Sequence, residues 1–129
     1  MTQEDKELLL KDLCARLPYG VRIEYNEEIY DVLGIAHGRV LLCKPFSSKT
    51  EKDCPLVEEV KPYLFPMSSM TGEQKEEYHN TCNVGLNRQG DEVYYDCDES
   101  LDWLNAHHLD YRGLITKGLA IDATGLNIY

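Results

Sequence analysis

Residues 21–46, VRIEYNEEIYDVLGIAHGRVLLCKPF, decide the expected fold because apolar and polar side chains alternate along much of their length. The alternation defines three short runs, at residues 21–25, 29–35 and 40–43. The chain turns after the first run at residues 26–28, and after the second at His37-Gly38, where glycine accepts a positive φ. Three such runs with short connections predict a three-stranded antiparallel meander.

One helix is expected before the meander and one further strand after it. Residues 3–17 carry leucines at helical spacing, with Thr2 as the N-cap and Pro18 just beyond their end. Residues 56–60 are expected to form a short fourth strand that Pro62 stops, because proline has no N–H for the ladder. With this strand, the small antiparallel sheet would resemble a partial SH3-like barrel, an analogy of architecture that implies no function.

The second half of the chain is expected to be mainly helical. The pattern predicts helices over 71–82 and 99–108, a loop over 83–92, a short strand over 93–96 and a short helix or turn over 114–120. Thr71 and Gln74 fit a capping box, and Asp98 or Ser100 can cap the later helix.

The apolar segment 62–70, PYLFPMSSM, is expected to lock the sheet onto the helical part, since its large side chains are costly to leave in water. The fold class is therefore α+β: an N-terminal helix, a small antiparallel sheet or partial barrel, and a helical C-terminal part. A chain of 129 residues fits a single domain, 1–129, with helix and meander over about 1–66 and the mainly helical part over about 67–129.

Composition narrows the classes of function. The net charge of −10 argues against a general nucleic-acid backbone binder, which needs clustered Lys and Arg. The first residues, MTQEDKE, are polar and acidic, which argues against a secretory signal, and no apolar run is long enough for a membrane span. Five cysteines at wide spacing fit reduced thiols. We expect a cytoplasmic protein without a membrane partner.

The segment 89–111 concentrates one sign of charge and several aromatic side chains. It holds seven acidic residues and no Lys or Arg, while the whole chain contains nine tyrosines. Tyrosine-rich surfaces are typical of protein contacts. We therefore expect a small non-catalytic interaction or regulatory protein that binds another protein through an acidic, Tyr-rich surface. The candidate contacts are Tyr94, Tyr95, Asp98, Asp102 and Trp103.

A metal site is the first alternative. His79 and Cys82 lie three residues apart on an expected helix, and Cys97, His107 and His108 follow downstream. Zinc sites usually show two close pairs of ligands, and only one pair here has suitable spacing. A small metal-dependent enzyme or zinc site around these five residues stays open as the runner-up.

No other catalytic or cofactor motif is complete in the sequence. The alternating oxygen ligands of residues 96–102 resemble a calcium loop, but Leu101 and His107 stand where an EF-hand needs glycine and glutamate. Glycine-rich phosphate loops are absent. We therefore predict no cofactor and no catalytic residue.

Two further alternatives concern partners. A nucleic-acid-binding small β-barrel would need its basic and aromatic residues to cluster in space, namely Arg22, Arg39, Lys44, Lys49, Lys52, Tyr25 and Tyr30. The overall acidity disfavours that arrangement. A homodimer built on an exposed sheet edge or on residues 63–65 also stays open.

Several short blocks of sequence carry a resemblance. They are LLLKDLCARLPYGV (8–21), KPYLFP (61–66), SSMT (68–71), EEY (76–78), WLN (103–105), His108, DYRGLI (110–115) and KGLA (117–120). Through these blocks, the chain resembles a group of short uncharacterised proteins found in gut anaerobic bacteria and their phages. The resemblance implies a cytosolic setting and a mobile-element context, and it transfers no catalytic or binding residue.

Overall fold

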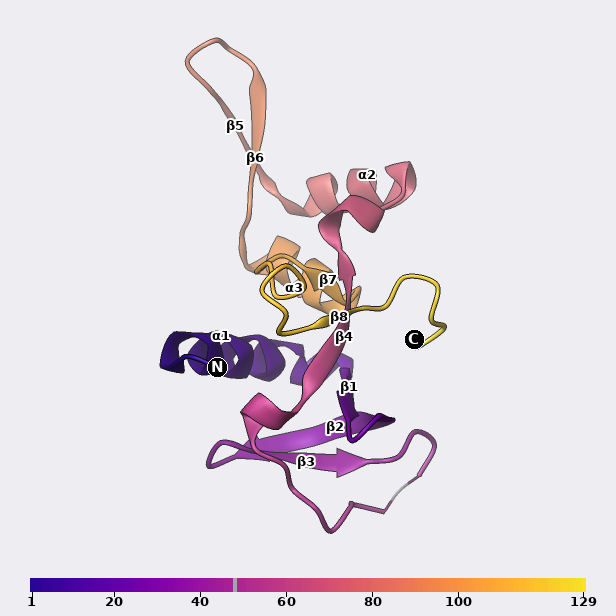
Figure 1. Ribbon diagram of the computed structural model, residues 1–129. Coiled ribbons are helices and arrows are strands. Elements are labelled where there is room, and N and C mark those ends of the chain that lie inside the picture. Colours follow the sequence, from indigo (N-terminus) through magenta and orange to yellow (C-terminus); the bar gives the residue numbers. More distant parts are fainter. Residues whose placement is uncertain (48) are drawn as a thin grey trace.

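The computed structural model describes residues 1–47 and 49–129 and shows an α+β fold (Figure 1). The helices are α1 (Gln3–Arg16), α2 (Gly72–Thr81) and α3 (Asp98–Ala106). The strands are β1 (Arg22–Tyr25), β2 (Glu28–Ala36), β3 (Arg39–Cys43), β4 (Lys61–Pro66), β5 (Asn83–Leu86), β6 (Glu92–Tyr95), β7 (Leu109–Asp110) and β8 (Ile121–Asp122).

The meander and the helices form where the sequence predicts them. β1, β2 and β3 pair antiparallel in chain order, with turns whose residues Asn26, Glu27, His37 and Gly38 have positive φ. The Thr2 hydroxyl caps α1, and the side chains of Thr71 and Gln74 form the predicted capping box of α2.

The main sheet is open and mixed, and it is not a closed barrel. Its strand order is β3-β2-β1-β4-β7, and β8 also pairs with β4. β4 is antiparallel to β1 but parallel to β7 and β8, which come from the last part of the chain. The sheet therefore extends beyond β4 onto C-terminal strands, while residues 50–57, which lead into β4, make backbone hydrogen bonds along the outer edge of β3.

The predicted fourth strand at residues 56–60 is wrong. A 3₁₀ turn occupies Val57–Glu59, and β4 begins only at Lys61 and includes Pro62. Proline is tolerated there because it is near the start of the strand, and β8 pairs only from Tyr63 onward. Within segment 62–70, the residues up to Pro66 belong to β4, which pairs with both the meander and the C-terminal strands, and Met67–Ser69 form a 3₁₀ turn.

A second error concerns residues 83–92, which contain β5 and the start of β6 and are not simply a loop. These strands form a two-stranded antiparallel hairpin that projects away from the main sheet (Figure 1). The predicted strand at 93–96 overlaps β6. The C-terminal part is therefore less purely helical than expected.

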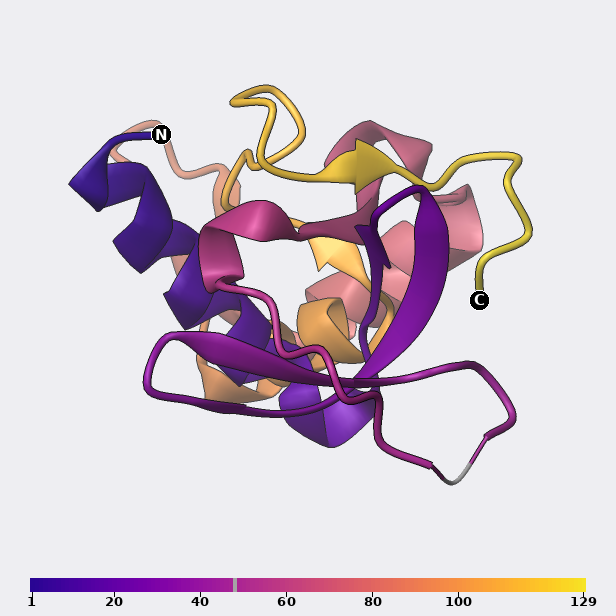
Figure 2. The same ribbon diagram turned by 60° about the horizontal axis from the view of Figure 1, so that its bottom comes forward.

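The core lies between the meander, α1 and the C-terminal segment. Leu9 and Leu13 of α1 pack with Ile23, Leu42 and Leu64 of the sheet. Leu114 and Leu119 are buried in the same cluster, so the C-terminal segment docks onto the core as predicted. Figure 2 shows α1 and the meander from below, with the C-terminal segment (yellow) above the meander in this view. Among the described residues, none of the helices has the length and apolar character needed to traverse a bilayer.

Candidate interaction surface

The projecting hairpin, residues 83–95, is called the arm, and one of its faces carries three exposed apolar or aromatic side chains beside Glu92. Val84 lies opposite Tyr94, and Leu86 lies opposite Glu92. Opposed residues point to the same side of a sheet, so these four side chains share one face. The exposed fractions of Val84, Leu86 and Tyr94 are 57%, 69% and 41%. The arm thus presents apolar side chains to solvent.

Tyr95 lies on the other face of the arm, where its ring covers Gly85. A Cβ atom at position 85 would lie 2.9 Å from Cε2 of the tyrosine, so only glycine leaves room for the ring in this position. Tyr95 itself is 52% exposed. The two predicted contact tyrosines, Tyr94 and Tyr95, are therefore both accessible, but from opposite sides of the arm.

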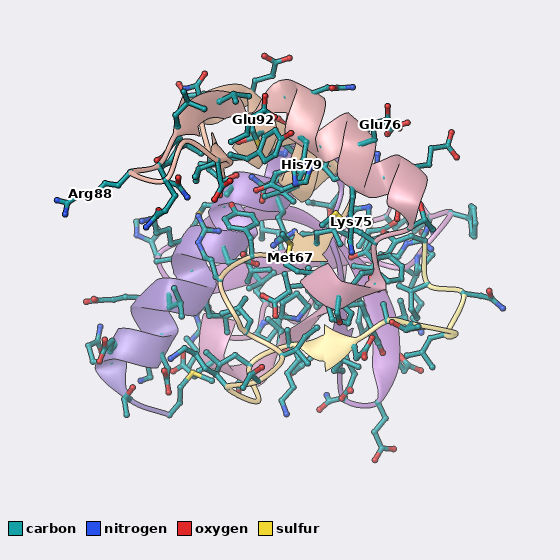
Figure 3. All side chains as sticks on the ribbon, turned by 90° about the horizontal axis from the view of Figure 1, so that it is seen from above. Met67, Lys75, Glu76, His79, Arg88 and Glu92 are labelled. Carbon is teal, nitrogen blue, oxygen red and sulfur yellow. The ribbon has the colours of Figure 1, made fainter. Side chains whose placement is uncertain are left out.

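A row of stacked aromatic side chains connects the arm to the two helices at its base. Tyr94 stacks on His79 of α2, with ring centroids 4.0 Å apart, and His79 contacts Tyr78. Tyr78 packs on Trp103 of α3, which stacks on His107 at 4.0 Å. We call these five residues the aromatic row. The side chain of His79 extends from α2 toward the arm (Figure 3).

Hydrogen bonds fix the junction between the arm and α3. The Tyr78 hydroxyl donates to the Asp96 carboxylate, and the Cys97 thiol donates to the Thr81 carbonyl at 3.1 Å. The buried Ser100 hydroxyl accepts from the Cys97 N–H at 2.8 Å. Burial, together with the neighbouring Asp96 carboxylate, raises the pKa of Tyr78, which keeps the phenol protonated as a donor.

The predicted acidic contacts lie on α3, the helix that also carries Trp103. Asp98 and Asp102 are exposed and one helical turn apart, and Asp98 is in the first turn, where the helix dipole favours negative charge. Partial burial and the Asp102 carboxylate raise the pKa of Tyr19. Of the five predicted residues, the structure joins Tyr94 and Trp103 through the row, while Tyr95 faces away from Tyr94.

Three residues of this surface, Val84, Leu86 and Tyr78, are not among the contacts expected from the sequence. Val84 and Leu86 fall in the expected loop 83–92, although their spacing by two is the period of a strand. Asn87 and Gly90 mark the intervening turn and could have identified the hairpin. No signal along the chain links Tyr78 to Trp103, because that contact joins different helices.

The five residues of the zinc alternative do not converge. His79 stacks on Tyr94, and His107 stacks on Trp103 while its Nδ1 bonds the Trp103 carbonyl at 2.8 Å. His108 instead stacks on Tyr129. Within residues 1–47 and 49–129, no group of three or more His, Cys, Asp or Glu side chains is placed to hold a metal ion.

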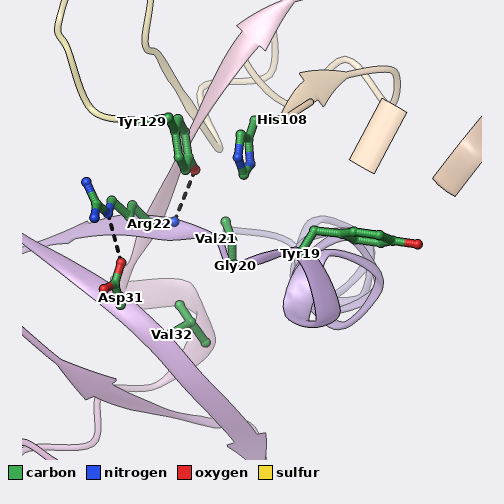
Figure 4. Close-up of a pocket in the computed structure, with 8 residues that line it drawn as sticks. All are labelled: Tyr19, Gly20, Val21, Arg22, Asp31, Val32, His108 and Tyr129. Atoms are coloured by element: carbon green, nitrogen blue, oxygen red, sulfur yellow. Dashed lines mark hydrogen bonds and ion pairs between the residues drawn. The ribbon is translucent and has the colours of Figure 1, made fainter. Parts of the chain in front are cut away.

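A cavity of about 450 Å³ lies away from the arm and is lined in part by Arg22, Asp31, His108 and Tyr129 (Figure 4). Arg22 Nε donates to the Asp31 carboxylate at 2.9 Å, and the rings of His108 and Tyr129 stack with centroids 3.5 Å apart. Burial, followed by the charges of Arg16, His107 and Arg22, lowers the pKa of His108 to about 4. The cavity therefore presents an internal ion pair and a neutral imidazole.

The basic residues of the nucleic-acid alternative are largely engaged within the sheet and its loops. Lys44 pairs with Glu28 at 2.9 Å, and Arg22 pairs with Asp31. Arg39 donates to the carbonyl of Cys54. The two ion pairs offset the positive charges of Arg22 and Lys44, which weakens the attraction of this part of the sheet for phosphates.

No protein-family model, no curated protein and no solved structure matches this chain. Function is therefore inferred from the arrangement of its residues.

Proposed function

We propose that this is a small non-catalytic interaction or regulatory protein that binds another protein through the arm and the aromatic row. The observation that carries this proposal is the exposure of Val84, Leu86, Tyr94 and Tyr95 on a segment that projects from the body. Val84, Leu86 and Tyr94 share one face of the arm, and exposed apolar groups that lie together on a small protein commonly mark an interaction site. Tyrosines suit such a site because their rings bury area while their hydroxyls stay hydrated.

The charge around this surface indicates the chemistry of the partner. Segment 89–111 carries seven acidic residues and no Lys or Arg, and Asp98 and Asp102 lie on α3, the helix that also carries Trp103. An electrostatically complementary partner presents basic groups around an apolar patch. Binding is therefore expected to weaken as salt is added, since exposed charges are screened beyond about 10 Å at 0.1 M ionic strength.

The test is affinity capture from the native cell, with and without phage infection, because the resemblance in sequence suggests a mobile-element setting. The bait is compared with the double variant Leu86→Ser/Tyr94→Ala, which removes apolar contacts from one face of the arm. We expect one dominant captured protein, whose affinity for the purified variant falls more than about tenfold.

The matched control is Leu33→Ser, since Leu33 is 53% exposed on β2, far along the chain from the arm. It should retain the partner with unchanged affinity. Retention of every partner by the arm variant would contradict the proposal. So would equal loss of binding in the control.

A further inference from the structure

The outer edge of β5 carries unpaired backbone groups. Among the described residues, β5 and β6 form a sheet of two strands only. The Asn87 N–H donates to the Asp91 carbonyl at 3.0 Å, so this pair is hydrogen-bonded across the hairpin. Bonded and non-bonded pairs alternate in an antiparallel ladder. Val84 and Leu86 therefore direct their N–H and C=O groups away from β6, toward the open edge.

This edge has none of the usual protection against pairing. β5 reads Asn83, Val84, Gly85, Leu86, without a charge, a proline or a bulge. Exposed edge strands normally carry such features because unpaired N–H and C=O groups recruit another strand. The neutrality of β5 is unusual in a chain with a net charge of −10.

We propose that a second copy of this chain pairs with β5 along this edge, antiparallel and about a two-fold axis through Gly85. In this register, Val84 of each copy lies opposite Leu86 of the other, and both are residues with outward-pointing backbone groups. Each such pair can exchange both of its hydrogen bonds. A two-fold axis makes the surface self-complementary, as in most homodimers.

The register also suits the charges and the side chains. The strands β5 and β6 of the two copies then form one four-stranded sheet. The rest of each acidic chain lies at the opposite end of this sheet from that of the other copy, which limits their repulsion. Arg88, which extends away from the molecule in Figure 3, comes opposite Cys82 of the second copy, at the C-terminal end of α2. A cation is favoured at that end of a helix. Val84 and Leu86 of both copies then form one continuous apolar face.

The expected dimer is weak and strengthens with salt. A four-residue edge is small beside the roughly 800 Å² per partner that stable interfaces bury. Two chains of charge −10 also repel at low ionic strength. This salt dependence is opposite to that expected for the basic partner. Failure of the dimer and failure of the proposed function are therefore separable, and neither rests on the other.

Sedimentation equilibrium of the untagged full chain up to about 1 mM, at low and high salt, tests the dimer. Val84→Pro removes an outward N–H without removing a hydrogen bond of the hairpin, and it should abolish self-association. The matched control Glu92→Pro makes the same change on the opposite edge and should still dimerise. A mass that stays monomeric throughout, or a dimer that survives Val84→Pro, would overturn the proposal.

Amide hydrogen exchange on the unmodified protein tests the register without relying on a variant that folds. The N–H groups of Val84 and Leu86 should exchange several-fold more slowly at high protein concentration than on dilution. The N–H groups of Glu92 and Tyr94, which point to the other edge, should not change. Protection of the second pair in place of the first would show that a different edge associates.

Discussion

At the residue scale, His108 couples protonation to stability. It has φ of 59°, and burial, then Arg16 of α1, His107 and Arg22 of β1, lower its pKa to about 4. The unfolded chain takes up this proton near pH 6.5, whereas the folded protein does so only near pH 4. The free energy of unfolding should therefore fall as pH drops through this window, by up to roughly 3 kcal/mol.

Urea unfolding between pH 7 and pH 4.5 measures this effect, with His108→Asn as the comparison. Asparagine tolerates a positive φ and carries no proton that titrates here. The variant should lose less stability than the wild type over the same range. Parallel pH profiles for the two proteins would rule out His108 as the source.

The burial of the charged residues Asp12 and Arg16 could not be predicted from the sequence. Asp12 and Arg16 are four apart, a spacing that predicts at most an exposed pair. Both are fully buried. Their charges are compensated by further partners, since Arg16 also donates to the Leu109 carbonyl at 2.7 Å and Arg112 donates to Asp12 at 3.0 Å. Those partners lie more than ninety residues away, so only the tertiary fold could place them.

At the element scale, the loop of the arm depends on one side chain. Oδ1 of Asn87 accepts from the N–H groups of Gln89 and Asp91, each at 2.9 Å. Asn87→Ala should destabilise the hairpin by about 1–2 kcal/mol, since both donors lose their protein partner. Hydrogen exchange should accelerate at the inward amides of Gly85 and Val93 while exchange in the main sheet stays unchanged.

Arg88→Ala is the control for this prediction, because it changes the neighbouring loop residue and spares those two hydrogen bonds. It should leave exchange in the arm within about twofold of the wild type. Faster exchange throughout the protein in Asn87→Ala would instead mean that the arm supports the global fold.

Elements defined by local signals were predictable, and elements defined by distant partners were not. The caps at Thr2 and Thr71 and the alternation of 21–43 identified α1, α2 and the meander. β4 was misplaced because its partners β7 and β8 come from the end of the chain, and two-residue strands have no pattern of their own. Of the five residues of the aromatic row, the sequence predicts only Tyr94 and Trp103 as contacts, since the stacking joins β6, α2 and α3 across space.

At the scale of the whole molecule, β4 is the element that ties the chain together. It pairs with β1 of the meander on one side and with β7 and β8 on the other. Its residue Leu64 is fully buried in the main core cluster, among side chains from both halves of the sequence. Loss of packing at this position should therefore affect the meander and the C-terminal part together.

Leu64→Ala should lower the free energy of unfolding by about 2–5 kcal/mol, the usual cost of such a cavity. Fluorescence of Trp103, the single tryptophan, reports on α3, and far-UV circular dichroism reports on the whole chain. Both transitions should move to lower denaturant by the same amount, as one cooperative domain requires. The exposed Leu33→Ala should move neither by more than about 0.5 kcal/mol. If the Trp103 transition stays in place while the other shifts, the C-terminal part folds independently and β4 only docks two separate units.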